Sequence, residues 1–181
     1  CHWRYLVDNL FGPVRAVSAV APTHIAERFD EEGSPYPVTA DDAAYATFEL
    51  DGGVFVQMNS SWCVRVYRDD LLAIQVDGTD GSAVAGLRDV VVQARWDTPR
   101  AIWNPDVENL FDYRSSWARV SSGAPEKNAF KAQWERFLRH VVCDEPFPWD
   151  FVEGAKGIQL AELALESARK RCWVDVPALE P

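Results

Sequence analysis

Alternating apolar and polar positions through the middle of the chain predict a series of antiparallel β-strands. In residues 43–50 the apolar side chains fall on every second position, at Ala44, Ala46, Phe48 and Leu50. This is typical of a strand with one buried face. Residues 51–53 read Asp-Gly-Gly, and glycine supplies the positive φ that tight hairpin turns need. The next strand is therefore expected to return antiparallel, and the full set of predicted strands is 14–22, 43–50, 54–62, 71–76, 82–87, 89–96, 117–120 and 172–176.

Apolar positions three and four residues apart predict a helix over residues 2–11. The Gly12-Pro13 pair ends it, because glycine favours the left-handed conformation at a helix end and proline cannot continue the helix. Residues 27–37 and most of 97–126 are polar and contain several prolines. We expect both segments to be loops.

Two more helices are predicted near the C-terminus. One covers residues 127–142 and has a single apolar stripe. The other follows Asp150, with Glu153 three residues later as in a capping box. The stripe of the first consists of Phe130, Trp134, Phe137, Leu138 and Val141.

This order of elements, strands first and helices afterwards, predicts the α+β class. The expected architecture is an open, mostly antiparallel β-sheet with helices packed on one face. The other face of such a sheet must be solvated or covered by a partner. It is therefore available for dimerisation.

The composition excludes several kinds of partner. A chain of 181 residues is long enough for one domain with a real core. Its formal net charge of −10 disfavours nucleic acid and anionic membrane surfaces. The sequence has no apolar run of about 20 residues and no signal peptide, so a cytoplasmic protein is expected.

The four cysteines are Cys1, Cys63, Cys143 and Cys172, and they lie far apart along the chain. This spacing favours reduced thiols over a disulfide scaffold, and it matches no zinc motif. The glycine pairs Gly78-x-x-Gly81 and Gly154-x-x-Gly157 are not a G-x-G-x-x-G fingerprint. No cofactor-binding or metal-binding residue is therefore predicted in this chain.

His2 is the first candidate for chemistry. An imidazole titrates near neutrality, so it can accept a proton from a hydroxyl group while hydride leaves the same carbon. A helical histidine is more often structural when nothing else supports a role. His140 is assigned to the polar side of its helix and His24 to a strand end, and both are interpreted as structural residues.

A second candidate site lies in residues 59–68, which combine hydrogen-bonding side chains with Trp62, Arg65 and Arg68. Such a set suits a sugar or polyol, which offers hydroxyls at its edge and C–H groups on its face. A loop tip with solvated arginines is an equally good interpretation. The acidic pairs at 41–42 and 69–70 are expected to be solvated turn residues.

These segments, taken in order, resemble the C-terminal domain of the glucose–fructose oxidoreductase and inositol dehydrogenase family, Gfo/Idh/MocA. The resemblance covers nearly the whole chain. It rests on the following motifs: His2 with Gly12 ten residues later, the strand at 14–21, Asp41-Asp42, the turn at 51–53, residues 76–82, Trp134 with Phe137-Leu138, Asp150, residues 160–168 and residues 173–176.

The resemblance implies a two-domain oxidoreductase. An N-terminal Rossmann domain, upstream of Cys1, would bind NAD or NADP, and residues 1–181 would be the C-terminal substrate-binding and dimerisation domain. The substrate would be a sugar, an inositol or a related polyol, oxidised by hydride transfer. The fragment alone is expected to be inactive, and a homodimer or higher oligomer is expected to form through the open sheet face.

The resemblance also assigns the candidate residues. The family uses a lysine from an E-K-P motif and a D-x-x-x-H pair, and His2 matches the histidine of that pair. The aspartate and the lysine would precede Cys1. Many members carry an aspartate three residues after the histidine, where this chain has Tyr5. Tyr5, Trp62, Arg65 and Arg68 are therefore the expected substrate-binding residues.

Two alternatives remain at this point. The first is a non-catalytic binding or dimerisation module of the same fold, since an uncovered sheet face can pack against a second copy. A glycosidase is the weaker alternative, because it needs two facing carboxylates across a cleft and the spacing of acids here does not favour that.

Overall fold

The computed structural model describes residues 2–65, 67, 70–100, 102–108, 112–121 and 128–179. The chain divides into two compact units, Cys1–Arg65 with Arg136–Pro181, and Val66–Glu135. All the strands paired in the described part of the chain are antiparallel, and every sheet there is open. The α+β prediction is confirmed.

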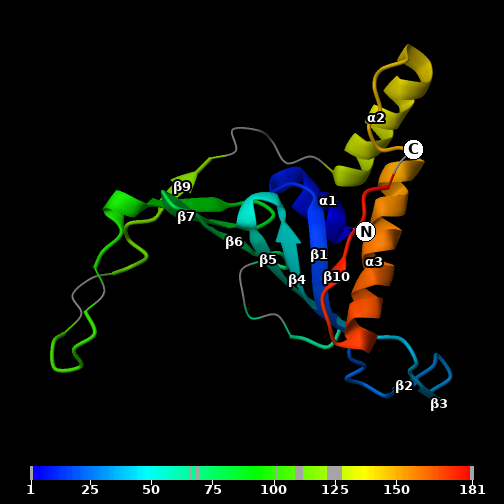
Figure 1. Ribbon diagram of the computed structural model, residues 1–181, viewed down its shortest axis with the longest axis horizontal. Helices are drawn as coiled ribbons and strands as arrows, with labels where there is room; N and C mark the ends of the chain where they lie inside the picture. The colour runs from blue at the N-terminus through cyan, green and yellow to red at the C-terminus, as the bar shows by residue number, and fades with distance from the viewer. Residues whose placement is uncertain are drawn as a thin grey trace. The chain divides into compact units, whose positions relative to one another are not determined.

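A four-stranded sheet forms the centre of the first unit, in the order β10-β1-β4-β5 (Figure 1). The strands are β1 (Val14–Val20), β4 (Ala43–Leu50), β5 (Phe55–Ser61) and β10 (Val174–Asp175). The strand from the C-terminal end therefore lies at one edge, beside β1. The predicted strands at 14–22, 43–50, 54–62 and 172–176 are confirmed, with the ends of three of them shortened.

The hairpin between β4 and β5 forms as predicted. The short 3-10 turn η1 (Asp51–Gly53) connects the strands. Gly52 and Gly53 have φ of 76° and 77°, which is the left-handed region that glycine adopts without a steric cost. Exposed Asp51 also accepts two hydrogen bonds from the Arg15 guanidinium, each over 2.7 Å.

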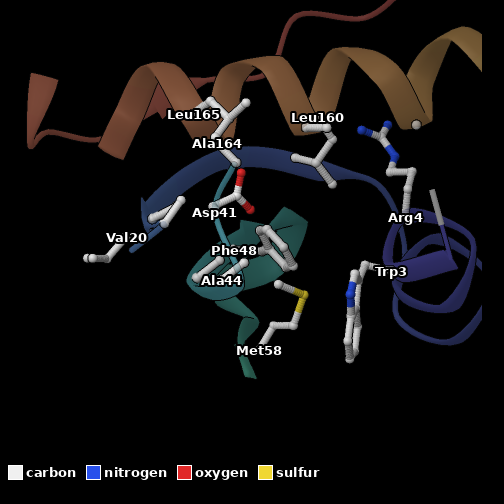
Figure 2. Close-up of a pocket in the computed structure, with 15 residues that line it drawn as sticks. Trp3, Arg4, Val20, Asp41, Ala44, Phe48, Met58, Leu160, Ala164 and Leu165 are labelled. Atoms are coloured by element: carbon white, nitrogen blue, oxygen red, sulfur yellow. The ribbon is translucent and has the colours of Figure 1, made fainter. Parts of the chain in front are cut away.

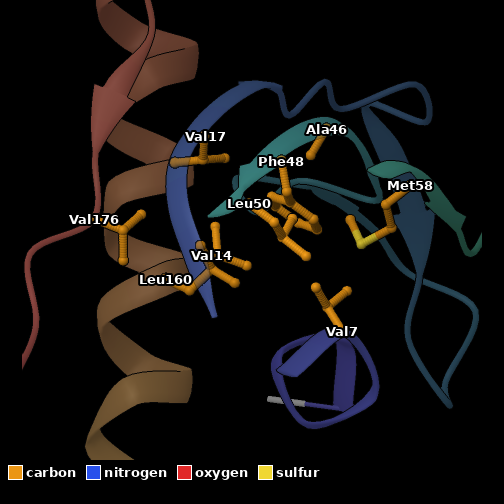
Figure 3. Packing of buried hydrophobic residues seen from close by; sticks show 9 residues of the cluster. All are labelled: Val7, Val14, Val17, Ala46, Phe48, Leu50, Met58, Leu160 and Val176. Atoms are coloured by element: carbon orange, nitrogen blue, oxygen red, sulfur yellow. The ribbon is translucent and has the colours of Figure 1, made fainter. Parts of the chain in front are cut away.

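Two helices, α1 (His2–Leu10) and α3 (Phe151–Lys170), pack on one face of this sheet. Figure 3 shows the apolar cluster between them and the strands. Phe48 is only 2% exposed at its centre, and Val17 of β1 lies beside it in the strand register. The cluster consists of Val7, Val14, Val17, Ala46, Phe48, Leu50, Met58, Leu160 and Val176.

The opposite face of the sheet carries side chains that the helices do not cover. Tyr45 and Phe55 occupy positions that alternate with the buried ones on β4 and β5, and Val20 lies opposite Tyr45 on β1. All three are exposed. The predicted division into a helix-covered face and an open face is therefore confirmed for this sheet.

Helix α3 begins and ends at identifiable caps. Asp150 accepts a hydrogen bond from the Glu153 backbone N–H over 2.9 Å, as predicted. The Glu153 carboxylate pairs with Lys156, so the capping box is only half formed. At the other end, Arg171 adopts the left-handed conformation, with φ 57°.

The prediction of a loop at residues 27–37 was wrong. Strands β2 (Glu27–Phe29) and β3 (Pro35–Pro37) form a small antiparallel hairpin there. The Asp30 carboxylate accepts the backbone N–H groups of Glu32 and Ser34, and this closes the turn. The two prolines of β3 led to the loop prediction, because proline usually argues against a strand.

The second unit contains a four-stranded sheet in the order β6-β7-β8-β9. Its strands are β6 (Ile74–Asp77), β7 (Gly81–Ala85), β8 (Val90–Ala94) and β9 (Ala118–Val120), and the turn η2 (Arg95–Asp97) follows β8. A Cβ atom at Gly81 would collide with the Gln93 carbonyl. Glycine is therefore required there for the close approach of β8.

Helix α2 (Ala129–Cys143) matches the prediction for 127–142. The side chains of its predicted apolar stripe are exposed in the structure. Near its C-terminal end, Phe147 stacks on His140, and Arg136 lies over the Trp149 ring. Within the described ranges, none of the helices combines the length and the apolar character that crossing a membrane requires.

Candidate functional site

A pocket of about 290 Å³ lies on the helix-covered face of the first unit (Figure 2). Helix α1 forms one wall, helix α3 a second, and strands β1, β4 and β5 the floor. Most of its lining is apolar. The residues are Trp3, Arg4, Ala19, Val20, Ala21, Asp41, Ala44, Ala46, Phe48, Met58, Gly157, Leu160, Ala161, Ala164 and Leu165.

His2 is at the start of α1, immediately before two residues of the pocket wall. Its side chain is exposed, so the imidazole is accessible to a substrate. The segment Phe11–Pro13 connects α1 to β1. Trp3 and Arg4 line the pocket at its α1 end, and Val20 lies at the opposite end (Figure 2).

Trp62 is hydrogen-bonded to the residue that precedes β4, and β4 lines the pocket. Its backbone N–H donates to the Asp42 carbonyl over 2.9 Å, and Asp41, next to Asp42, lines the pocket. The Trp62 ring is 88% exposed. Arg65 is also exposed, whereas Arg68 lies outside the described residues.

Asp42 is a buried charged residue immediately before β4. The prediction that it is a solvated turn residue was wrong, because only 3% of it is exposed. Its carboxylate accepts the backbone N–H groups of His24 and Ile25 over 2.8 and 2.9 Å. The Nη2 atom of Arg28 lies 3.5 Å from Asp42 Oδ2 and forms an ion pair with it.

These contacts lower the pKa of Asp42 to about 2. The largest cause is the hydrogen bond from the His24 backbone, and those from Ile25 and from the Cys63 thiol lower it further against the opposing effect of burial. For Cys63 the effect is reversed. Burial, followed by the neighbouring Asp42 carboxylate, raises the pKa of the thiol. The carboxylate of Asp42 thus holds the loop at 24–25 against the segment that begins at Trp62.

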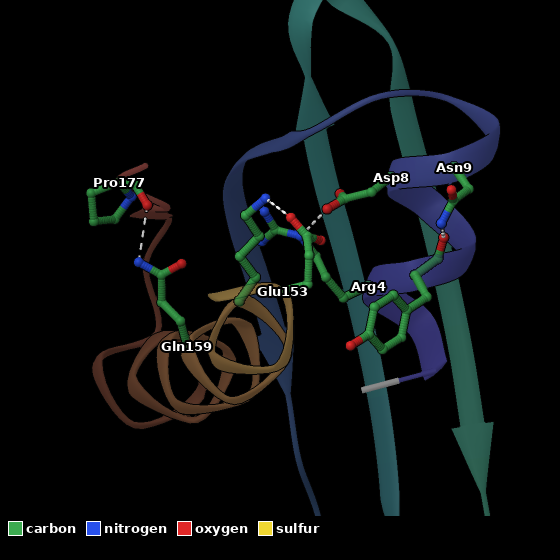
Figure 4. Close-up of polar contacts among 8 residues, drawn as sticks. Arg4, Asp8, Asn9, Glu153, Gln159 and Pro177 are labelled. Carbon is green, nitrogen blue, oxygen red and sulfur yellow. Dashed lines mark hydrogen bonds and ion pairs between the residues drawn. The ribbon is translucent and has the colours of Figure 1, made fainter. Parts of the chain in front are cut away.

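Arg4 is a site residue that the sequence reasoning missed. It is only 6% exposed, and its Nε donates to the Asp8 carboxylate over 2.5 Å. Figure 4 draws this pair beside Glu153 of α3. The Nη1 atom of Arg4 is buried without a hydrogen-bond partner. Its position three residues before the buried Val7 was the available signal, because residues that far apart share a helix face.

The predicted substrate-binding residues come from two elements. Tyr5 is half-buried on α1, where its backbone carbonyl accepts from the Asn9 amide. Trp62 and Arg65 follow β5. Among the described residues, no hydrogen bond, ion pair or ring contact joins His2 or Tyr5 to Trp62 or Arg65, and none of these four residues lines the pocket.

The remaining histidines have local partners. The His24 Nε2 atom lies 3.4 Å from the Tyr45 hydroxyl, and His140 Nδ1 lies 2.7 Å from the Glu145 carbonyl. No cluster of three or more potential metal ligands occurs among the residues that the structure places.

The comparison with known families agrees with this geometry. Residues 1–84 match the family of GFO/IDH/MocA C-terminal domains. The chain carries a GFO/IDH/MocA C-terminal domain. The resemblance found in the sequence is thereby confirmed, and the matched residues include α1, the β4–β5 hairpin and the segment after Trp62.

One curated relative is similar to the chain over nearly its whole length. The D-xylose dehydrogenase of Paenarthrobacter nicotinovorans is 48% identical over 183 residues, which cover 99% of this chain and 47% of that protein. The chain therefore spans about half the length of its curated relative.

Solved structures share the fold of this GFO/IDH/MocA domain. Levoglucosan dehydrogenase in its apo form superposes with a TM-score of 0.75 at 20% identity, covering 99% of this chain and 50% of that one. Its complex with NADH and L-sorbose gives 0.74 at 21% identity, covering 96% and 48%. An oxidoreductase domain protein from Kribbella flavida gives 0.71 at 19% identity, covering 97% and 48%.

Proposed function

We propose that this chain is the substrate-side domain of an NAD(P)-dependent dehydrogenase that oxidises a sugar, with D-xylose as the first substrate to test. The observation that carries the proposal is the 48% identity to a D-xylose dehydrogenase over 99% of the chain. The exposed His2 beside a pocket wall supports it. Inositols and related polyols belong to the same substrate class and complete the test panel.

The described residues do not themselves fit a dinucleotide. Their paired strands are all antiparallel, whereas the dinucleotide-binding motif needs parallel strands joined through a helix and a glycine-rich turn. We therefore assign NAD or NADP to a separate domain of the complete protein. When bound there, the nicotinamide would accept hydride from the substrate carbon.

The role proposed for His2 is proton transfer. Oxidation of a secondary alcohol or a hemiacetal releases a hydride from carbon and a proton from the hydroxyl group. The His2 imidazole would accept that proton, directly or with an upstream lysine, and the C–O bond would become a carbonyl. Its exposure on the first turn of α1 leaves it free to approach a bound sugar.

Tyr5, Trp62, Arg65 and Arg68 would position the substrate. The exposed indole of Trp62 offers a flat apolar face for sugar C–H groups. The two arginines and the Tyr5 hydroxyl offer hydrogen bonds to substrate oxygens. Substituting Trp62 by alanine is expected to raise KM about tenfold with a smaller change in kcat, and Trp96→Ala, in the second unit and also exposed, is the matched control.

A homodimer through the open sheet face is part of the proposal. Val20, Tyr45 and Phe55 expose apolar surface there, and a second copy of the same face would cover it. This face also defines the alternative function, a binding or dimerisation module without catalysis.

The test is turnover by the enzyme encoded by the complete reading frame. Reduced nicotinamide would be followed by absorbance with NAD and NADP against D-xylose, other sugars, inositols and polyols. Reduction that requires a sugar supports the dehydrogenase. No turnover with any pair, in a protein that is folded and dimeric, would support the non-catalytic module.

A further inference from the structure

The second sheet, β6 to β9, separates apolar from polar side chains by face (Figure 1). Residues that pair directly across antiparallel strands point to the same side of a sheet, and the pairing here advances one residue at a time along each strand. One face, called the apolar face below, therefore carries Ile74, Val76, Ala83, Ala85, Val90, Val92, Ala94, Ala118 and Val120. The other face carries Gln75, Asp77, Ser82, Val84, Val91, Gln93 and Arg119.

The burial of these residues does not follow the division into faces. On β4 of the first sheet, the side chains of the helix-covered face from Ala46 to Leu50 are buried and those between them are not. On β7 and β8 every residue is intermediate in exposure, whichever face it belongs to. Val76 and Val120, on the two edge strands, are 37% and 47% exposed. Among the described residues of the second unit, burial therefore does not single out the apolar face.

An apolar face of this kind marks an interaction surface. A sheet with one solvated face normally places its apolar side chains on the covered side and its polar ones in water. The sequence of the second sheet has that alternation, whereas the burial of its central strands does not. A contiguous set of exposed methyl groups is typical of a surface that another protein surface covers.

The composition of the apolar face fits a second copy of the same chain. In a two-fold symmetric interface each residue near the axis meets its own counterpart, so a charged residue there would face a like charge. The chain has a formal net charge of −10, but the apolar face carries only alanine, valine and isoleucine side chains. Two pleated faces with such short side chains can pack about 10 Å apart, as the sheets of a β-sandwich do.

We propose that the apolar face of the second sheet packs against the same face of a second copy of the chain. This surface is additional to the homodimer surface proposed on the first sheet, and it does not depend on the dehydrogenase reaction. Val92 has paired neighbours on both sides, Ala83 and Ala118, so it lies near the centre of the apolar face. Its counterpart in the second copy would lie close to it.

Val92→Glu tests the proposal, with Val91→Glu as its matched control. The two valines are adjacent on β8, have the same intermediate exposure and point to opposite faces. The oligomeric state of the 181-residue chain would be measured by sedimentation velocity over a series of concentrations. We expect Val92→Glu to raise the dissociation constant of the self-associated form about tenfold or more, because it places like charges in contact. Val91→Glu is expected to leave the constant unchanged.

A second variant separates self-association from folding. Val76 lies on the edge strand β6 and is already exposed, so Val76→Glu adds the same charge to the apolar face without disturbing buried packing. It should also weaken self-association. Circular dichroism and thermal unfolding of all three variants would show that each one keeps the fold of the wild type.

The proposal is overturned if the wild type stays monomeric up to roughly 0.1 mM, or if folded Val92→Glu and Val76→Glu associate as the wild type does. Weakening by Phe55→Ala but not by Val92→Glu would show that the first sheet alone forms the contact, and it would also overturn the proposal. None of these measurements uses nicotinamide or a sugar. A failure here would therefore leave the proposed dehydrogenase function untouched, and a failure of that function would leave this result standing.

Discussion

Trp62 donates its backbone N–H to the carbonyl oxygen of Asp42 over 2.9 Å, while the Asp42 side chain accepts from the backbone of His24 and Ile25. One buried residue therefore connects two chain segments far apart in the sequence. The first carries the candidate substrate residue Trp62, and the second follows β1. Asp42 is a positioning residue for this end of the sheet.

Asp42 is expected to make the stability of the protein sensitive to acid. Folding lowers its pKa from 3.8 to about 2. A carboxyl group of this kind stabilises the folded state above its unfolded pKa, and the stabilisation is lost as the pH falls through the lowered value. The free energy of unfolding should therefore fall between pH 3.8 and about 2 through this group.

Urea unfolding at several pH values would test this with Asp42→Asn. The variant should be less stable than the wild type at neutral pH, and the difference should shrink in that acidic range. Asp41→Asn, at the exposed neighbouring position, is the control. An unchanged difference between wild type and Asp42→Asn across the acidic range would contradict the role of Asp42.

Cys63 is expected to react slowly with alkylating reagents. Burial and the Asp42 carboxylate both raise the pKa of its thiol, and the thiolate is the reactive form. Cys143 and Cys172 are exposed free cysteines in the same chain and serve as internal controls. A time course with iodoacetamide, read by peptide mass spectrometry, should show both modified before Cys63; earlier modification of Cys63 would disprove this prediction.

Alanine substitutions of two phenylalanines on opposite faces of the first sheet are expected to have different effects. Phe48 is 2% exposed in the core, and Phe55 on the neighbouring strand is 60% exposed. Phe48→Ala should lower the free energy of unfolding by about 3–5 kcal/mol. Phe55→Ala should have little effect on the unfolding of the monomer but should weaken self-association.

Denaturant unfolding and sedimentation velocity distinguish these two effects. Equal destabilisation by both substitutions would contradict the assignment of the faces. Unchanged sedimentation in Phe55→Ala, in a wild type that dimerises, would show that the dimer uses a different surface.

The C-terminal end of α3 offers a stabilising substitution. Arg171 has φ 57° and ψ 42°, a left-handed conformation that costs a residue with a Cβ atom roughly 1 kcal/mol relative to glycine. Arg171→Gly should therefore raise the melting temperature. Lys170→Gly, one residue earlier and still helical, should lower it. A lower melting temperature in Arg171→Gly would refute this account of the cap.

The alternation of apolar residues was sufficient to predict the main sheet, because strand faces repeat every two residues. The β4 side chains Ala44, Ala46, Phe48 and Leu50 were assigned to the correct face for this reason. The β2–β3 hairpin was missed, since it is held by backbone bonds and the Asp30 turn, neither of which creates an apolar pattern.

The candidate site was predictable only in part. His2 and Trp62 stand out by residue type and by the family resemblance. The burial of Asp42 and the unpaired Nη1 of Arg4 depend on tertiary contacts between α1, α3 and the strand ends, which a single sequence does not show. In the sequence both are ordinary charged residues, and charged residues are mostly exposed.

The central claim is that this domain contributes His2 to proton transfer in a sugar dehydrogenase. The most direct measurement compares kcat/KM for D-xylose in the complete enzyme and in its His2→Ala variant. The account predicts nicotinamide reduction that requires the sugar and falls by a factor of about 100 or more in the variant. Turnover of a sugar that is indifferent to His2 would contradict the assignment.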